Sequence, residues 1–345
     1  MNGSPAVKVS ILMPSFNVGK YIEPCIRSVI SQTLQEIEII CIDAGSTDGT
    51  LEILQKYSTM DSRIRLIHSD RKSYGYQVNL GIETASGEYI GIVETDDYAA
   101  DNMFQILYEH AVQFGKPDVV KSAYYRLLKK GSDEQLVPHY IISSETKKPF
   151  PISQHYELLS EHPSIWSCIY KRSFLLQKNI RMPELPGAAW VDNPFLFQSL
   201  CEARQIVWVH QPLYVYRELN PDSSTNLMKD CSIPISRANE IKDYLESKYP
   251  RNIHLEAVLY DRVLYYKKLI SSSPFCDDTH LSAMSQLLHR FRKRAVFFRH
   301  LKWGLKITGD VIECCREHGI KTTIETVQQK AKSKFRPSHS GEHSR

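Results

Sequence analysis

The sequence contains no apolar run long enough to form a membrane-spanning helix. Apolar stretches such as Val9–Met13 and Ile37–Ile42 are far shorter than the ~20 residues that cross a bilayer. Residues Met1–Pro5 also lack the basic segment and following apolar stretch that a signal peptide would have. We therefore expect a cytoplasmic protein.

Sites for zinc, for disulfide exchange and for nucleic acids are also poorly supported. No two of the 8 cysteines have the Cys-x-x-Cys spacing of a zinc or redox site. The formal net charge of +4 is too small to indicate a nucleic-acid partner. What is present is an ordinary globular composition, 42% hydrophobic over 345 residues, which can bury a large core.

The first part of the chain alternates short apolar runs rich in β-branched residues with helical patterns. The runs are Val9–Met13, Ile37–Ile42, Ile64–Ile67 and Tyr89–Val93. This alternation is typical of an α/β fold with a mostly parallel sheet flanked by helices. Ligands bind such sheets beyond the carboxyl ends of the strands, where three polar clusters of this sequence fall.

The first polar cluster is acidic and directly follows the predicted strand Tyr89–Val93. It contains Glu94, Asp96 and Asp97. Hard divalent ions such as Mg²⁺ and Mn²⁺ take oxygen ligands, often one or two carboxylates together with substrate phosphates. The cluster therefore indicates a metal and a nucleoside diphosphate; the alternative is a solvated turn with Asp97 near the start of a helix.

A second polar cluster begins at Asp43, at the end of the predicted strand Ile37–Ile42. Its carboxylate could accept hydrogen bonds from a base or a ribose. The alternative is a turn-forming aspartate that bonds to its own backbone, which is common in Asp-containing turns.

Taken together, the motifs resemble the family-two inverting glycosyltransferases of the GT-A (Rossmann-like) fold. Five of them occur in the order of that family: Val9–Asn17, Ser28–Thr33, Asp43–Asp48, Asn79–Ile90 and Glu94–Asp97. A weaker similarity continues through Trp166–Phe174, Trp190–Phe195 and Pro212–Arg217. The resemblance covers about Val7 to Asn226.

The resemblance implies a role for each matching position. Asp43 would contact the nucleotide base, Asp96 would lie near the ribose or the metal, and Asp97 would bind Mn²⁺ or Mg²⁺ directly. The other residues expected at the nucleotide are Pro14, Ser15, Phe16, Asn17, Tyr76 and Asn79. Asp192 would be the catalytic base.

Asp192 is the only acid in its motif, because Val191 stands where the family usually has Glu. A helix N-cap before Pro194 is the alternative role for Asp192, and the two roles are compatible. Trp166 and Trp190 flank this motif and are candidate contacts for an acceptor sugar, although packing against the sheet is an equally good explanation.

We predict a GT-A-like catalytic domain over residues 1–226, with a nucleotide-binding half (1–115) and an acceptor half (116–226). A helical extension (227–331) and a disordered basic tail (332–345) would follow. Residues 284–306 combine an apolar stripe with basic side chains, which indicates either peripheral association with the inner face of the membrane or a helix packed on the catalytic domain.

The function expected from the resemblance is inverting transfer of a sugar from a nucleoside diphosphate, such as a UDP-sugar, to an acceptor hydroxyl. The acceptor would be a saccharide or a lipid-linked or protein-linked glycan in bacterial surface polysaccharide, lipopolysaccharide or glycoconjugate synthesis. One alternative is a catalytically inactive sugar-nucleotide-binding or scaffold protein. Another is a nucleotidyltransferase, which would need a glycine- and lysine-rich loop where Pro14–Lys20 has one of each.

Overall fold

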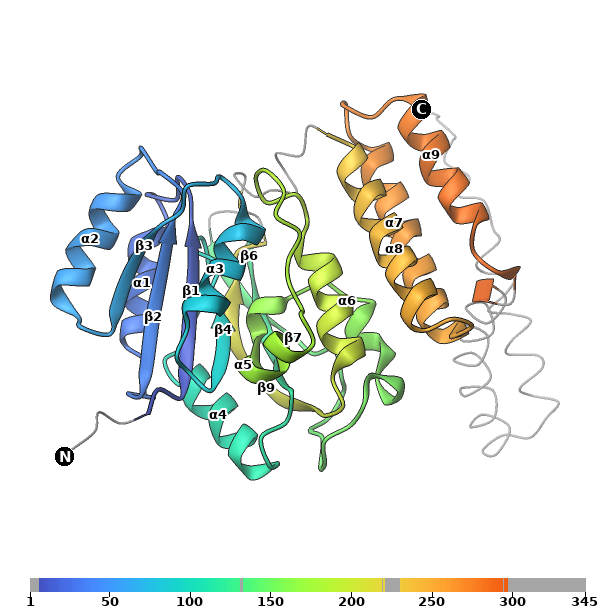
Figure 1. The fold of residues 1–345 in the computed structure, drawn as a ribbon. Coiled ribbons are helices and arrows are strands. Elements are labelled where there is room, and N and C mark those ends of the chain that lie inside the picture. The colour runs from blue at the N-terminus through green and yellow to red at the C-terminus, as the bar shows by residue number, and fades with distance from the viewer. Residues whose placement is uncertain (1–5, 131–132, 219, 221–229, 294, 297–345) are drawn as a thin grey trace, which may run out of the picture. The chain divides into compact units, whose positions relative to one another are not determined.

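The structure is a computed structural model that describes residues 6–130, 133–218, 220, 230–293 and 295–296 (Figure 1). Contacts divide the chain into a unit of residues Met1–Arg290 and a second unit of residues Phe291–Arg345. The first unit contains every element discussed below. Most of the second unit, including the predicted tail 332–345 and the predicted helical residues 297–331, lies outside the described residues.

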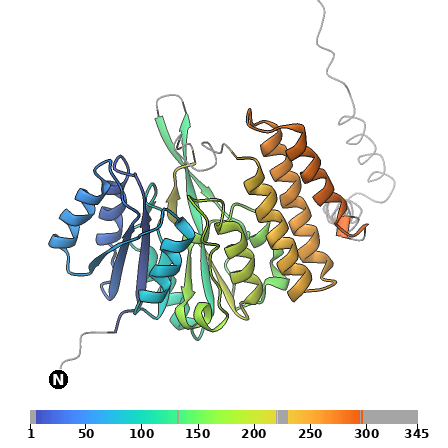
Figure 2. The ribbon, with the colours of Figure 1, turned by 45° about the horizontal axis from the view of Figure 1, so that its top comes forward.

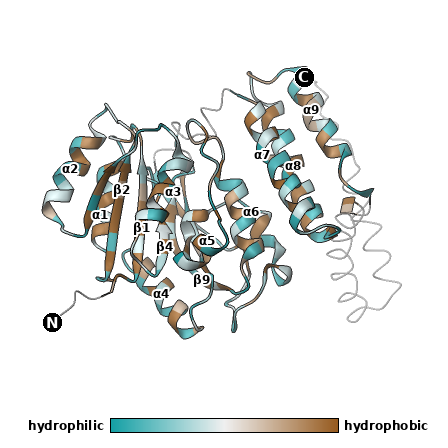
Figure 3. Cartoon of the chain, in the orientation of Figure 1, coloured by the Kyte–Doolittle hydropathy of each residue, from teal (hydrophilic) through white to brown (hydrophobic). Residues whose placement is uncertain are grey.

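Four parallel strands form the first half of the sheet, in the order β3-β2-β1-β4. They are β1 (Val9–Ser15), β2 (Ile37–Asp43), β3 (Ile64–His68) and β4 (Tyr89–Ile92). The helices that follow these strands along the chain are α1 (Ile22–Ile30), α2 (Thr50–Met60), α3 (Tyr74–Thr84) and α4 (Met103–Gln113). Every residue of β1 and β2 is buried, so both faces of these strands are covered, and the apolar colour in Figure 3 is strong along β2.

The second half of the sheet is mixed. β8 (Cys168–Lys171) is antiparallel to β4 and to β6 (Val119–Lys130), and β9 (Ile206–Tyr216) is parallel to β6. β5 (Tyr98–Ala99) and β7 (Asp133–His139) add short antiparallel edges to β9 and β6. Hence the predicted α/β class is confirmed, and the mixed pairing is confined to the strands that follow β4.

Short helices connect the strands of this second half. They are η1 (Ile152–Gln154), η2 (Tyr156–Leu159), η3 (Ile165–Ser167), α5 (Arg172–Gln177) and α6 (Asp192–Glu202). α6 matters most for the site, because it begins at the predicted catalytic base Asp192.

Three helices follow: α7 (Ser232–Lys248), α8 (Ile253–Ser271) and α9 (Asp278–His289). They pack on one another, α7 also contacts α6, and α8 also contacts η2 (Figure 2). Side chains fix where two of them begin, since Asn252 accepts hydrogen bonds from the backbone of His254 and Leu255, and Asp277 forms a capping box with His280. The domain limit at residue 226 stays a prediction.

Met284 and Leu287, on the apolar stripe of the predicted membrane-binding stretch, are buried in the folded unit. Residues 297–306 of that stretch lie outside the described residues. Within the described part of the chain, no helix is both long and apolar enough to span a bilayer.

Candidate active site

The carboxyl ends of β1, β2 and β4 bring the polar clusters to one edge of the sheet. Ser15, the last residue of β1, pairs in register with Asp43, the last residue of β2. β4 pairs with β1 in parallel and leads into Glu94–Asp97. The topology therefore places these polar segments together, as parallel strands require.

Asp43 has the contacts of a turn former. Its Oδ2 accepts hydrogen bonds from the backbone N–H groups of Gly45 (2.9 Å) and Ser46 (3.0 Å), and its Oδ1 accepts one from the Ser46 hydroxyl (2.5 Å). The side chain is fully buried. Within the protein, Asp43 therefore acts as the turn-forming aspartate that was the alternative to a nucleotide contact. Contact between Asp43 and a nucleotide base stays a prediction.

The other residues predicted at the nucleotide surround this turn. Pro14 and Ser15 are buried at the end of β1, while Phe16 is 40% exposed beneath the Lys72 ammonium. Asn17 accepts a hydrogen bond from Thr47 N (2.9 Å) through its side chain, in a left-handed backbone conformation (φ 51°).

Tyr76 and Asn79 both lie on α3. The Arg71 guanidinium lies 4.4 Å from the centre of the Tyr76 ring. Asn79 is buried and uses both side-chain polar atoms on the protein, bonding the N–H of Met182 (2.9 Å) and its carbonyl (2.8 Å). Asn79 therefore holds the chain at Met182 in place, and any contact with the nucleotide stays a prediction.

Asp96 and Asp97 differ in accessibility. Asp97 is 2% exposed, and its Oδ1 accepts a hydrogen bond from Arg217 N (2.7 Å). Asp96 is partly exposed and accepts a hydrogen bond from the Asn220 side-chain amide (2.7 Å). Burial, followed by the nearby Asp96 charge, raises the pKa of Asp97 well above its usual range.

These two carboxylates fit a divalent ion held jointly with substrate phosphates. Asp97 Oδ2 is buried, and no described residue provides it with a hydrogen-bond partner. Across the same residues, no group of three His, Cys, Asp or Glu side chains is arranged to hold an ion. Because Mg²⁺ commonly takes only one or two carboxylates and completes its shell with phosphates and water, a pair suffices for such an ion.

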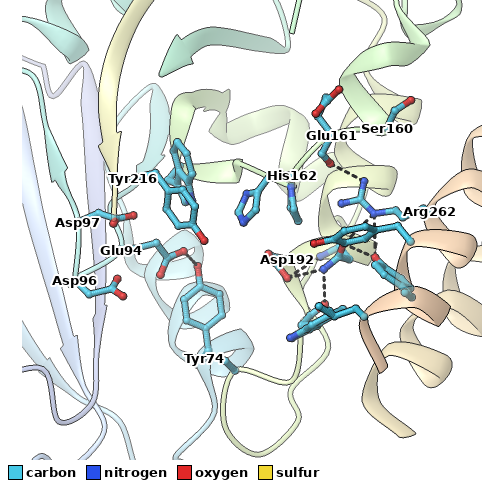
Figure 4. A pocket seen from close by; sticks show the side chains of 18 residues that line it. Tyr74, Glu94, Asp96, Asp97, Ser160, Glu161, His162, Asp192, Tyr216 and Arg262 are labelled. Carbon is cyan, nitrogen blue, oxygen red and sulfur yellow. Dashed lines mark hydrogen bonds between the residues drawn. The ribbon is translucent and has the colours of Figure 1, made fainter. Parts of the chain in front are cut away.

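A cavity of about 450 Å³ joins this acidic pair to Asp192. Figure 4 shows Glu94, Asp96 and Asp97 on one side of the cavity, with Asp192 and Arg262 on the other. Of the sequence-predicted residues, the cavity brings together Asp96, Asp97, Asp192, Trp166 and Trp190. The residues predicted at the nucleotide other than Asp96 lie outside its lining.

Asp192 is the first residue of α6 and is partly buried. Its Oδ1 accepts hydrogen bonds from the backbone N–H and the side-chain amide of Asn193, both at 3.0 Å. Burial raises the pKa of Asp192, while the Arg262 charge and the Asn193 hydrogen bonds oppose the rise. The alternative role of Asp192 as the helix N-cap does not match the structure, because the capping position is Val191 and no side chain caps the helix there.

The tryptophans differ in their packing. Trp166 is 3% exposed and stacks on Tyr214 (4.2 Å between ring centres) and Tyr216 (5.4 Å). Trp190 is 9% exposed and meets Tyr266 edge to face. Both side chains line the cavity as well as packing in the core, and acceptor contact stays a prediction for each.

The chain around Trp190 has an unusual backbone. Gly187 (φ 70°), Ala189 (φ 45°) and Trp190 (φ 54°) are all left-handed, which is rare for residues with a side chain. Two backbone hydrogen bonds fasten this segment to the start of α3, Tyr74 N to Gly187 O (3.0 Å) and Gly187 N to Lys72 O (2.8 Å). Strain of this kind persists where the surrounding contacts fix it, often beside functional groups.

Sequence reasoning did not identify His162, Arg262 or Tyr266, all of which line the cavity. Burial lowers the pKa of His162 to about 3, so its imidazole is neutral at physiological pH. Arg262 and Tyr266 lie on α8, far along the chain from Asp192. The only signal for them was their separation by four residues on a predicted helix, which places two side chains on one face.

Known proteins are similar to this chain in sequence and in fold. The family model described as "Glycosyl transferase family 2" matches residues 10–178. The uncharacterized glycosyltransferase EpsJ of Bacillus subtilis (strain 168) is 35% identical over 226 residues, which are 64% of this chain and 63% of EpsJ. The glycosyltransferase GlyG of Streptococcus pneumoniae is 32% identical over 219 residues, which are 61% of this chain and 70% of GlyG.

A solved structure supports the fold assignment. The crystal structure of S. aureus TarS 1-349 in complex with UDP-GlcNAc matches with a TM-score of 0.71 at 17% identity, covering 94% of this chain and 92% of that chain. The GT-A-like fold predicted from the sequence is thereby confirmed. The match to GlyG over 70% of its length and the family model over residues 10–178 agree, and the chain belongs to glycosyltransferase family 2.

Proposed function

We propose that the chain is a metal-assisted, inverting glycosyltransferase that moves a sugar from a UDP-sugar to an acceptor hydroxyl. The observation that carries this proposal is one cavity that contains both the acidic pair Asp96–Asp97 and, facing it, the carboxylate of Asp192 (Figure 4). Membership of the family supports sugar transfer. The UDP-GlcNAc bound by the structural neighbour TarS supports a UDP donor.

In the proposed reaction the acceptor oxygen attacks the anomeric carbon on the face opposite the diphosphate. The new carbon–oxygen bond forms as the bond to the diphosphate oxygen breaks, and the acceptor proton passes to Asp192. Asp192 Oδ1 is already occupied by two Asn193 N–H groups, whereas Oδ2 receives no hydrogen bond from any described residue. Oδ2 is therefore the atom that we assign as proton acceptor.

Asp96 and Asp97 would hold Mn²⁺ or Mg²⁺ together with the donor phosphates. A bound ion supplies positive charge against the negative charge that develops on the departing diphosphate. Arg217 is a further cation for this purpose. Its Nε is buried without a hydrogen-bond partner among the described residues, and its backbone N–H is bonded to Asp97.

The acceptor would enter on the side of Trp166 and Trp190. We propose a saccharide or a lipid-linked or protein-linked glycan as its class, in the synthesis of a bacterial surface polysaccharide or related glycoconjugate at the inner face of the membrane. The bacterial relatives EpsJ and GlyG support a bacterial setting for the proposal and do not specify the acceptor.

The direct test is a screen of UDP release from purified UDP-sugars, with Mn²⁺ or with EDTA. We expect release from at least one donor with Mn²⁺, and Asp192→Asn should slow it about 10²- to 10⁴-fold while UDP–Mn²⁺ affinity is unchanged. Glu202→Gln, at the far end of α6, is the matched control and should behave as the unmodified chain. Donor binding without release by the unmodified chain would instead support the inactive, sugar-nucleotide-binding alternative.

A further inference from the structure

Two residues of α8 reach the candidate base through a single amide. Asn193 Oδ1 accepts a hydrogen bond from the Tyr266 hydroxyl (2.6 Å) and another from Arg262 Nε (3.1 Å). The same Asn193 donates its backbone and side-chain N–H groups to Asp192 Oδ1. Asn193 thus links Asp192 to a helix that lies about seventy residues further along the chain.

Arg262 also holds a second segment of the cavity lining. Its Nη1 donates hydrogen bonds to the carbonyls of Leu159 (2.5 Å) and Glu161 (2.9 Å), beside His162. The Nε atom contacts the Tyr266 hydroxyl as well (2.9 Å), so the two α8 side chains support each other. One guanidinium therefore contacts both the segment that carries Asp192 and the segment that ends at Glu161.

Burying the charge of Arg262 destabilises the folded state, so a functional role would explain its position. Arg262 is 5% exposed, and no carboxylate within the described residues forms an ion pair with it. Buried charges destabilise a fold unless they are paired and well hydrogen-bonded, and apolar residues of similar size are often the more stable choice. Asp192 is the carboxylate whose pKa Arg262 lowers most directly, which gives the buried charge a role at the site.

We propose that Arg262 and Tyr266 are positioning residues for sugar transfer, which hold the Asp192 carboxylate through Asn193 with Oδ1 occupied and Oδ2 available to the acceptor. This inference rests on the proposed role of Asp192 as base. It makes α8 part of the catalytic apparatus, although α8 lies outside the stretch that matches the family model.

The two α8 residues should affect the base differently. Arg262 contributes a positive charge that lowers the pKa of Asp192, so its removal raises that pKa. Tyr266 contributes no positive charge; its hydroxyl donates to Asn193 and accepts from Arg262. The other titratable groups whose charges interact with Asp192 are Glu94 after β4, Tyr74 of α3 and Tyr216 of β9. These groups are common to all the variants below.

The test uses the full chain with Mn²⁺ and the UDP-sugar selected by the screen, and it compares Tyr266→Phe, Arg262→Lys and Arg262→Gln. Lys268→Gln, an exposed cation on the same helix, and Tyr244→Phe, a phenol on α7, are the matched controls. We measure the rate of UDP release against pH, the Kd of UDP–Mn²⁺ by calorimetry, and the thermal midpoint.

We expect Tyr266→Phe and Arg262→Gln to lower the rate of UDP release on the order of 10- to 100-fold with the Kd of UDP–Mn²⁺ within twofold of the unmodified chain. The acidic limb of the pH profile should move to higher pH in Arg262→Gln and stay in place in Tyr266→Phe. Arg262→Lys keeps the charge and should retain the position of this limb. If Arg262→Gln does not fold, Tyr266→Phe and Arg262→Lys still test the rate.

The inference is overturned if Tyr266→Phe and Arg262→Lys release UDP as fast as the control variants. It is also overturned if the variants lose UDP affinity in parallel with the rate, because that result indicates a merely structural role. If Asp192→Asn is inactive while the α8 variants are normal, only this inference fails. If Asp192→Asn keeps full activity, the proposed base fails and this inference fails with it.

Discussion

The Tyr74 hydroxyl donates a 2.5 Å hydrogen bond to the carboxylate of Glu94, inside the cavity that contains Asp96, Asp97 and Asp192. Burial is the main cause that raises the pKa of Glu94 to about 8, and the charges of Asp96 and Asp192 add to it. The hydrogen bond from Tyr74 opposes the rise but does not cancel it. Glu94 is therefore protonated at neutral pH when no cation is bound nearby.

This relationship predicts a pH-dependent stability of the metal-free protein. Below pH 4.5 Glu94 is protonated in both the folded and the unfolded chain; above it the unfolded chain loses the proton first, so the folded state is progressively destabilised up to pH of about 8. In EDTA, we expect the thermal midpoint of Glu94→Gln to exceed that of the unmodified chain by a margin that increases from pH 5 to pH 8. Glu52→Gln, exposed on α2, is the control, and a difference independent of pH would contradict the assignment.

The buried Oδ2 of Asp97 predicts a divalent requirement for donor binding. We expect UDP to bind tightly only with Mn²⁺ or Mg²⁺, and Asp97→Ala to abolish both this dependence and UDP release. Asp101→Asn, at an exposed position four residues away, should leave both intact. Full activity in excess EDTA, or an active Asp97→Ala protein, would remove the metal from the proposal.

Asp43 can be tested as a nucleotide contact and as a turn former separately. Ser46→Ala removes the hydroxyl that bonds Asp43 Oδ1 but keeps the carboxylate, whereas Asp43→Ala removes both functions. If Asp43 contacts the base, Asp43→Ala should weaken UDP binding, measured by calorimetry, more than it slows the reaction at saturating donor. Ser46→Ala should weaken UDP binding much less than Asp43→Ala does. Equal affinities in the two folded variants would leave Asp43 as a turn former only.

The left-handed backbone at Ala189 predicts an asymmetry between neighbouring alanines. Glycine adopts this conformation at no steric cost, so Ala189→Gly should leave the free energy of unfolding unchanged or raise it by up to about 1 kcal/mol. Ala188 has no such backbone, and Ala188→Gly should lower the free energy of unfolding by roughly 0.4–1 kcal/mol, because glycine gains entropy when unfolded. Denaturant unfolding measures both, and equal losses would show that the loop is unstrained.

Local patterns were sufficient to predict the first half of the sheet. The apolar runs that became β1 and β2 are interrupted only by Ser10 and Glu38, and every residue of the two strands is buried, as is typical of parallel strands covered on both faces. The same order of strands and turns allowed the prediction that Asp96 and Asp97 end a strand. Asp192, which the family resemblance implies as the base, lines the same cavity, and its role stays a prediction.

The second half of the sheet and the contribution of α8 to the cavity depend on contacts between distant residues, which sequence periodicity does not encode. β6 pairs with β9 across more than eighty residues, and Arg262 meets Asn193 across 69. An arginine in an apolar helix is predicted to be exposed, since charged side chains are rarely buried. Only the positions of Asn193 and of the Leu159 and Glu161 carbonyls explain why Arg262 is inside.

The link from Asn193 to α8 has a consequence for the order in which the enzyme becomes active during synthesis. Strands β1 to β8 and the residues Asp96, Asp97 and Asp192 all precede residue 193, and β9 (Ile206–Tyr216) precedes α8, so the nascent chain can begin to fold its sheet while α8 is still being made. Arg262 and Tyr266 join the site only after residue 266 has been translated. If the proposed roles hold, a growing chain that already binds donor would have an unsupported base, and transfer would reach its full rate only when the last partner of Asn193 has arrived.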